Sequence, residues 1–257
     1  MRLDLNCDCG ESYNDRIIGN DEAIIPLVSS INLACGAHGG DPLTLTKAIR
    51  LAKAHHVAIG AHPSYPDLEG FGRRELALNP EQLILSLKEQ MLYLQQMTHE
   101  NGTELHHIKA HGALYNKAMY DQTTIRLFCQ AIQAAGLHLS VVMMSASPMI
   151  PIVEAYGFPV IQEVFADRNY TADNQLVPRS QPNALISDPA EVSRRAVQLV
   201  KDGYIESIEG TRLMLKADTL CVHGDGTHAL DDILAIRSAF KSERIELEQP
   251  LKNDRDR

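Results

Sequence analysis

Short apolar runs and longer helix-like segments alternate along the chain. The apolar runs have the length of buried strands, and in the first of them apolar and polar residues alternate with a period of two. These runs cover residues 3–8, 31–35, 57–61, 106–110, 139–144, 160–165 and 219–222. Helix-like segments begin at Pro42, Pro80, Asp121 and Pro189, and shorter ones cover residues 21–29, 148–156 and 229–240.

This alternation predicts the fold class. Three helix-like segments open with a proline that follows Asp41, Asn79 or Asp188, which are residue types that commonly cap a first helical turn. Seven strands that alternate with seven helices predict parallel strands joined by helical crossovers. No linker-like composition interrupts the series, so we expect one α/β domain over residues 1–240. A seven-stranded (β/α) barrel similar to the TIM barrel is favoured over an open sheet.

The first strand, within LDLNCDCGES (residues 3–12), separates polar and apolar residues onto opposite faces. Asp4, Asn6 and Asp8 share one face, which in a barrel can point into the lumen. Asp8 is nearest the carboxyl end of the strand, so we expect it to reach a site there. Asp4 lies deeper and is expected to be a buried hydrogen-bonding residue.

Cys7 and Cys9 occupy the opposite face of this strand and form a C-x-C pair. Zinc binding by this pair would require two further ligands on the same side, and the sequence offers none at a recognisable spacing. We therefore interpret both thiols as small apolar groups packed toward the helices. The chain has five cysteines, an odd number, and their spacing shows no disulfide framework.

Four predicted strands end in an apolar residue, a histidine, and then glycine or proline. These histidines are His38, His62, His111 and His223. The carboxyl ends of parallel strands meet at one end of the sheet, where α/β proteins build their sites. Acidic residues lie at or near the ends of these and the other predicted strands, at Asp8, Asp41, Glu163, Asp167 and Asp225. The pattern predicts a site that combines imidazoles with carboxylates.

Two kinds of chemistry suit such a cluster. Asp8 with His38, His62 and His111 offers the ligands that zinc or another divalent cation prefers, and leaves room for water. Neutral histidines can instead form hydrogen bonds to a substrate or exchange protons with it. The sequence leaves both possibilities open.

Composition narrows the range of partners. The formal net charge of −9 argues against a nucleic-acid groove, which needs concentrated Lys and Arg. The start MRLDLNCDCGE is charged throughout, unlike a signal peptide, and prolines break the most apolar stretch, residues 139–161. We expect a cytoplasmic protein whose partners are small molecules or other proteins, with neither nucleic acid nor membrane among them.

The last segment, residues 241–257, has dense mixed charge and few apolar residues. This composition predicts a solvated or disordered tail. Ile245, Leu247 and Leu251 are the residues in it that can dock onto the domain.

Several blocks of sequence together resemble one known family. The blocks are DLNCDCGES, ACGAHGGD, IGAHPSYPDLEGFGR, IKAHGALYN, EVFADRNYTADNQLVPRSQPNALI and CVHGDG. In this order they are similar to the motifs of the LamB/YcsF family, and the resemblance runs from residue 3 to about residue 240. It implies a seven-stranded (β/α) barrel of the glycoside hydrolase and polysaccharide deacetylase type.

The resemblance also implies an activity. Members of this family act as the A subunit of the prokaryotic ATP-dependent 5-oxoprolinase. This enzyme opens the lactam of 5-oxo-L-proline to give L-glutamate while ATP is hydrolysed to ADP and phosphate, and it requires partner subunits B and C. The chain contains neither a G-x-x-x-x-G-K-[ST] loop nor a G-x-G-x-x-G turn after a strand. We therefore expect ATP to be bound mainly together with the partner subunits.

The implied mechanism begins when ATP phosphorylates the amide oxygen, after which water attacks the activated carbon. Asp8, His62 and His111 are expected to form the hydrolytic centre, with one of them acting on water. Lys109, Arg168 and Arg179 are expected to hold the substrate carboxylate or the phosphoryl group. Further binding residues are expected at Asn6, His38, Glu163, His223 and Asp225. Asp225 would orient a neighbouring imidazole.

Some of these assignments have structural alternatives. Lys109 can point into the helix layer, and Arg168 can pair with Glu163 or Asp167. Tyr115 and Asn116 are expected to line the pocket. The remaining histidines carry no comparable signal and are interpreted as structural; they are His55, His56, His99, His106, His107, His138 and His228.

Five positions depart from the pattern expected of the family. Cys7 and Cys9 stand where an aliphatic residue or alanine is expected, and Ala110 stands in place of a proline. Asn174 and Asn183 replace glycines, and Asn is the residue other than glycine that best tolerates positive φ. None of these changes removes a charged or histidine position of the motifs.

Two other functions remain compatible with the sequence. A metal-dependent deacetylase or amidohydrolase, acting on a carbohydrate or another amide, would work without ATP and lose activity to chelators. A non-catalytic subunit that binds a lactam would lose binding, rather than turnover alone, when Asp8 or His111 is replaced.

Overall fold

The computed structural model describes residues 1–226 and 228–250. Within them, seven parallel strands form a closed barrel, because β1 pairs with both β2 and β9. The barrel strands are β1 (Arg2–Cys9), β2 (Ser30–Ala34), β3 (Ala58–His62), β4 (His107–Lys109), β5 (Ser140–Met144), β6 (Val160–Phe165) and β9 (Thr219–Val222). The predicted α/β barrel is confirmed.

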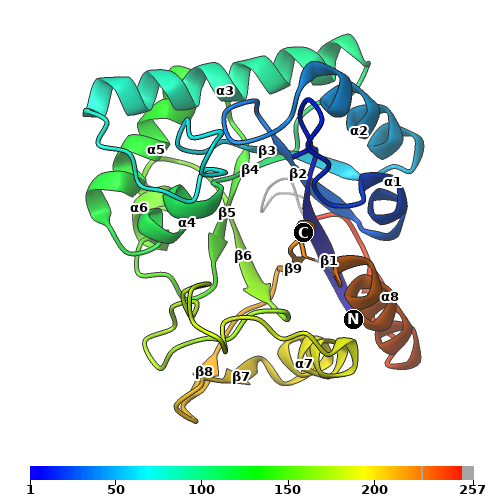
Figure 1. Ribbon diagram of the computed structural model, residues 1–257. Coiled ribbons are helices and arrows are strands. Elements are labelled where there is room, and N and C mark those ends of the chain that lie inside the picture. Colours follow the sequence, from blue (N-terminus) through cyan, green and yellow to red (C-terminus); the bar gives the residue numbers. More distant parts are fainter. Residues whose placement is uncertain (227, 251–257) are drawn as a thin grey trace.

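Helices surround the barrel on the outside (Figure 1). They are α1 (Asp21–Ile24), the 3-10 turn η1 (Ile25–Leu27), α2 (Pro42–Ala54), α3 (Pro80–Glu100), α4 (Gly112–Ala118), α5 (Gln122–Ala134), α6 (Ile150–Ala155), α7 (Pro189–Asp202) and α8 (Ala229–Ser242). Asp41, Asn79 and Asp188 cap α2, α3 and α7, as predicted. Asp41 is therefore a helix cap and does not join the strand-end site. No helix in the described ranges combines the length and apolar character needed to cross a membrane.

Two short elements were missed by the sequence patterns. Helix α4 follows β4 directly, and it carries Tyr115 into the interior. An antiparallel hairpin of β7 (Tyr204–Glu206) and β8 (Arg212–Met214) lies between α7 and β9. Both elements are too short to impose a recognisable period on the sequence.

The segment that follows residue 240 is folded up to residue 250, which corrects the prediction of a solvated or disordered tail. Helix α8 continues to Ser242, Ile245 is buried, and β10 (Glu246–Leu247) pairs with β1. Residues 241–250 thus belong to the fold, because Ile245 and Leu247 dock onto it as the sequence allowed. Leu251 and the residues after it lie outside the described part of the chain.

The two faces of β1 behave as the alternation predicts. Cys7 and Cys9 are buried free thiols in the apolar core between strands and helices. Asp4 lies buried on the lumen side, and its carboxylate accepts hydrogen bonds from the hydroxyls of Ser29, Ser30 and Thr219. Burial raises the pKa of Asp4 to about 6, and these hydrogen bonds offset the effect only in part.

The raised pKa of Asp4 predicts a pH-dependent stability. The carboxyl favours folding fully below its unfolded-state pKa of 3.8, and this contribution is lost as the pH rises through about 6. The Asp4→Asn variant lacks this titration. Between about pH 4 and pH 7, the unfolding free energy of the wild type should therefore fall relative to that of the variant by up to about 3 kcal/mol. Urea unfolding across this pH range measures the difference, and parallel profiles for the two proteins would contradict the prediction.

Candidate active site

A pocket of about 360 Å³ opens at the carboxyl ends of the barrel strands. This volume suits a small-molecule ligand. The predicted site residues that line it are Asp8, His62, Lys109, His111, Arg168, Arg179, His223 and Asp225. Tyr115 and Asn116 line it too, as expected. Asn6, His38 and Glu163 do not line the pocket, but they are buried and contact residues that do.

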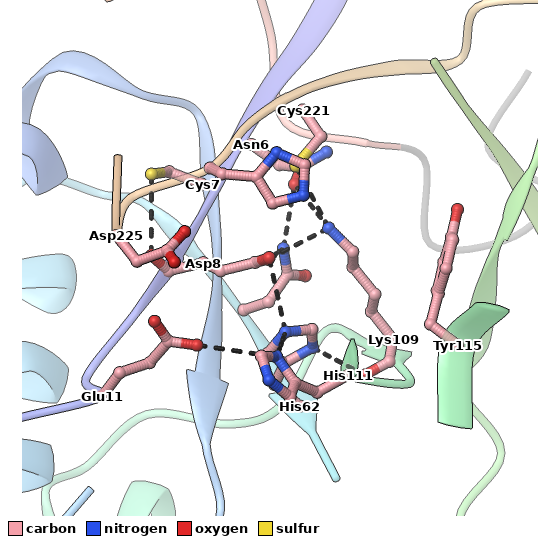
Figure 2. A network of polar contacts seen from close by, with 12 residues as sticks. Asn6, Cys7, Asp8, Glu11, His62, Lys109, His111, Tyr115, Cys221 and Asp225 are labelled. Atoms are coloured by element: carbon pink, nitrogen blue, oxygen red, sulfur yellow. Dashed lines mark hydrogen bonds and ion pairs between the residues drawn. The ribbon is translucent and has the colours of Figure 1, made fainter. Parts of the chain in front are cut away.

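Lys109 links two carboxylates inside the barrel. Its Nζ lies 3.0 Å from Asp8 Oδ1 and 2.8 Å from Glu163 Oε1. The lysine is 3% exposed, so the alternative in which it points into the helix layer is wrong. Figure 2 shows its ammonium group directed at Asp8. Burial opposes the charge of Lys109, but Asp8, Cys221 and Glu163 raise its pKa well above the ordinary value.

Asp8 is held ionised by its surroundings. Burial opposes ionisation, yet His62 and Lys109 lower the pKa of Asp8 well below its usual value. Its Oδ1 accepts hydrogen bonds from Lys109 Nζ and, at 2.8 Å, from Asn32 Nδ2. Its Oδ2 faces His62 Nε2 at 3.4 Å. The two oxygens of this carboxylate therefore have different environments.

Asn32 and His107 support this network, and the sequence assigned a site role to neither. Asn32 lies beside Asp8 in the β1–β2 register and also donates to Asn6 Oδ1 at 2.9 Å. His107 Nε2 donates to Asn32 Oδ1 at 2.8 Å. Gly60 on β3 makes room for this imidazole, because a Cβ there would overlap it. The alternation of polar and apolar residues in β2 could have placed Asn32 on the lumen side. Nothing in the sequence distinguished His107 from the histidine before it.

Each of three imidazoles near the pocket is fixed by one ring nitrogen. His62 Nδ1 donates to the carbonyl of Lys109 at 2.8 Å, and His111 Nε2 donates to the carbonyl of Phe71 at 2.9 Å. His38 Nδ1 lies 2.9 Å from Ser64 Oγ. Burial lowers the pKa of His38 and of His111 well below the ordinary value, so both are neutral near pH 7.

Glu11 is a site residue that the sequence did not predict. It follows the turn at Gly10 after β1, is 3% exposed, and lines the pocket. Its Oε1 lies 3.4 Å from His38 Nε2 and 3.6 Å from His111 Nδ1. Burial and the nearby charge of Asp8 raise the pKa of Glu11 well above its usual value. Its position just after the first strand was the feature of the sequence that could have identified it as a site residue.

The pocket mouth carries two arginines that share one carboxylate. Asp225 pairs with Arg73 and lies 3.5 Å from Arg179 Nη1. Arg73 comes from the loop after β3 and was not predicted from the sequence. The expectation that Asp225 orients an imidazole is wrong: Asp167 does so, with its Oδ2 2.7 Å from His223 Nδ1. At the pocket entrance, Asp225 thus pairs with both arginines, and another anion can take its place beside either of them.

Arg168 holds the loop that covers one side of the pocket. It is 5% exposed, and its Nε and Nη2 donate to the carbonyls of Ala184 and Val177 at 3.3 and 2.7 Å. These contacts replace the suggested pairing with Glu163 or Asp167. Arg168 thereby fixes the segment between Val177 and Ala184, which carries Arg179 of the pocket mouth.

The four predicted metal ligands, Asp8, His38, His62 and His111, fall into two overlapping sets once the unpredicted Glu11 is included. Asp8, His62 and His111 form one set, and Glu11, His38 and His111 form the other. Within each set the ligand atoms lie within 4.8 Å of one another. The mixture of imidazole and carboxylate ligands suits zinc and similar cations.

Comparison with known proteins identifies the family. The sequence model of the LamB/YcsF family matches residues 3–255. This chain belongs to the LamB/YcsF family. The match covers the barrel and each block of sequence from which the site is built.

Relatives of this LamB/YcsF chain match it over nearly their full length. It is 44% identical over 247 residues to a protein of Thermus thermophilus named as the A subunit of 5-oxoprolinase, covering 96% of this chain and 99% of that protein. It is 44% identical over 246 residues to the protein of the same name from Bordetella pertussis, covering 96% and 98%. The crystal structure of a lactam utilization protein from Thermus thermophilus superposes with a TM-score of 0.90 at 43% identity, covering 96% and 99%.

The buried position of Lys109 predicts a large effect of its removal. The Lys109→Met variant leaves Asp8 and Glu163 without their shared cation, so the free energy of unfolding should fall by about 3–5 kcal/mol. The surface variant Lys117→Met, which removes an exposed pair with Glu75, should change it by less than about 1 kcal/mol.

Denaturant unfolding of the two variants makes the comparison. A Lys109→Met, Glu163→Gln double variant should recover part of the loss, because one uncompensated charge is then gone. Equal stability of Lys109→Met and wild type would show that the buried carboxylates do not depend on this lysine.

Proposed function

We propose that this chain is the A subunit of an ATP-dependent 5-oxoprolinase, which converts 5-oxo-L-proline to L-glutamate while ATP is hydrolysed to ADP and phosphate. The near full-length identity to relatives that carry this name is the observation on which the proposal rests. The pocket supports it, because a volume of about 360 Å³ suits a small lactam and its walls carry both acid–base groups and cations.

The chemistry explains why ATP is required. A five-membered lactam is an unstrained amide, so its carbonyl must be activated before water adds. Transfer of the γ-phosphoryl group to the amide oxygen releases ADP and gives an imidate phosphate. Water then adds to the carbon, the ring C–N bond breaks, and the nitrogen takes up a proton. A second water releases phosphate and leaves L-glutamate.

The residues of the pocket are suited to the water and the charge in these steps. His62 Nε2 and His111 Nδ1 are 3.0 Å apart, and each is the ring nitrogen left free by its backbone hydrogen bond. Either can accept a proton from water. Asp8 stabilises the positive charge that then forms, and Lys109 stabilises negative charge at the carbonyl.

The arginines at the mouth suit the substrate carboxylate. Arg73 and Arg179 share Asp225 and are partly exposed, with side-chain accessibilities of 39% and 28%. An incoming carboxylate can pair with either guanidinium in place of Asp225. Arg168 acts through the loop that it holds.

We assign ATP binding to the complex with partner subunits B and C. The chain lacks the phosphate-binding loops named above, and the name of its relatives describes one subunit of a larger enzyme. The reaction belongs in the cytoplasm, where ATP is available. The isolated chain should be inactive or nearly so.

Turnover by reconstituted complexes tests this function. ADP and glutamate should form in step only when the chain, subunits B and C, ATP and 5-oxo-L-proline are combined. The Asp8→Asn and His111→Gln variants should lower kcat about 10²–10⁴-fold while calorimetry still detects substrate binding. His55→Gln, at the exposed end of α2, should match wild type.

Other outcomes identify the rivals. Cleavage of an amide by the chain alone, without ATP, would favour a deacetylase-like amidohydrolase. Loss of substrate binding as the sole defect of the variants would favour a non-catalytic carrier.

Kinetics of Arg179→Gln test the carboxylate site. Loss of one charge-assisted hydrogen bond should raise KM for 5-oxo-L-proline about 10–100-fold, with a smaller effect on kcat. Arg194→Gln, which removes a surface pair with Glu191 on α7, is the matched control and should leave both constants unchanged. An unchanged KM for Arg179→Gln would place the substrate carboxylate elsewhere.

A further inference from the structure

Opening of the lactam requires a proton at the ring nitrogen as well as a base for water. An amine anion is a very poor leaving group, so the C–N bond breaks only when the nitrogen takes up a proton. The base comes from His62 or His111, which line the pocket and each keep one ring nitrogen free of backbone hydrogen bonds. His223 is a further imidazole in the wall of the same pocket.

His223 faces the pocket from the opposite side of the barrel. It directly follows β9, whereas His62 ends β3 and His111 comes soon after β4. In the closed order of strands, β3 and β4 are neighbours, and each is three strands away from β9 (Figure 1). A substrate between these walls therefore has a base on one side and a second proton-transfer group on the other.

The nitrogen that fixes the His223 ring has a charged partner. His223 Nδ1 donates to Asp167 Oδ2 at 2.7 Å, and the backbone N–H of His223 donates to the same oxygen at 3.4 Å. The rings of His62 and His111 donate instead to neutral backbone carbonyls. A carboxylate at Nδ1 stabilises the imidazolium form, which is the form that acts as an acid.

The charge of Asp167 is directed mainly at this imidazole. Among the described residues, its other oxygen, Oδ1, is buried and has no hydrogen-bond partner. The guanidinium of Arg168 donates to the carbonyls of Val177 and Ala184 rather than to its neighbour in the chain. Burial opposes ionisation of Asp167, but His223 lowers its pKa below the usual value. Asp167 is therefore the ionised partner that a proton donor requires.

Phe165 fixes the plane of the His223 ring. The two rings are stacked, with centroids 5.4 Å apart and planes 17° from parallel, and Phe165 itself is buried. The second ring nitrogen, Nε2, bonds none of the described residues, and the side chain is 15% exposed at the pocket wall. The ring is thus held by its plane and by Nδ1, while Nε2 is left for a ligand.

We propose that His223 protonates the ring nitrogen and thereby couples the hydrolysis of ATP to ring opening; this role rests on the proposed function. Addition of water to the imidate phosphate gives a carbon that carries a hydroxyl, the phosphate oxygen and the ring nitrogen. The proton on Nε2 passes to the nitrogen, and the electron pair of the C–N bond leaves with it as an amine. The hydroxyl becomes the carbonyl of γ-glutamyl phosphate and gives its proton to the base. His223 regains a proton from solvent.

The same adduct can break in a second way. When the nitrogen receives no proton, phosphate is the better leaving group, and its C–O bond breaks instead. The carbonyl then reforms on the oxygen that came from water, and the product is 5-oxo-L-proline again. ATP has been consumed without formation of glutamate. A proton donor at the nitrogen therefore decides which of the two bonds breaks.

The products of the reconstituted complex test this role. Wild type, combined with subunits B and C, should form ADP and glutamate in step. In His223→Gln, glutamate formation should fall about 10²–10⁴-fold while ADP release falls far less, so the ratio of ADP to glutamate rises. In ¹⁸O-labelled water, the 5-oxo-L-proline recovered from this variant should carry the label, because each abortive cycle exchanges its carbonyl oxygen.

Further variants separate this role from a structural one. Asp167→Asn keeps the shape of the side chain but removes its charge, and it should shift the ratio in the same direction. His223→Ala leaves space for free imidazole, which should restore part of the glutamate formation when it is added to the buffer. His111→Gln acts before the branch and should lower ADP and glutamate together. His138→Gln, at an exposed position, is the matched control and should behave as wild type.

Three results would overturn the assignment. ADP and glutamate that still form in step in His223→Gln, at whatever rate, would show that another group protonates the nitrogen. Loss of 5-oxo-L-proline binding as the main defect of this variant, measured by calorimetry, would make His223 a binding residue. A wild-type complex that forms no glutamate would remove the proposed function as well, whereas a coupled wild type with an unchanged ratio in the variant removes the role of His223 alone.

Discussion

The ammonium group of Lys109, buried between Asp8 and Glu163, is the interaction on which the interior of this barrel depends. A charge removed from water is tolerated only when opposite charges and hydrogen bonds surround it. The lumen therefore contains polar side chains where many barrels pack layers of branched apolar residues. Asn6 and Tyr115 complete the arrangement, because each donates a hydrogen bond to Glu163.

A polar lumen shifts the hydrophobic stabilisation to the outer layer. The apolar face of β1 contributes Leu5, Cys7 and Cys9 to the core between strands and helices, and each of these residues is at most 1% exposed. The strict alternation of the first strand follows from this division, because one face must satisfy charges and the other must exclude water. Substitution of two thiols at positions where aliphatic residues are expected is compatible with this role, since buried thiols pack as apolar groups.

Much of the barrel and part of the site could be predicted from the sequence, because period and strand ends are local signals. His62 at the end of β3 and His111 just after β4 converge with Asp8, since parallel strands bring their carboxyl ends together. Contacts between distant segments carry no such signal: Arg73 reaches Asp225 from a loop without periodicity, and only the register of β4 against β3 turns His107 inward. The average composition of the segment after residue 240 is dominated by charged residues, so it predicts a solvated segment. It does not show that a single apolar residue in it, Ile245, is buried against the domain.

The carboxylate of Asp8 joins the structural and the chemical halves of the site. Its Oδ1 is occupied by Lys109 and Asn32, which fix the side chain within the lumen. Its Oδ2 faces His62, whose ring is in turn 3.0 Å from His111. A group held by one oxygen keeps the other in a fixed position at no further entropic cost, which is the physical meaning of preorganisation. The buried lysine therefore does more than stabilise the barrel: it keeps Asp8 charged and aimed at the imidazoles beside the pocket.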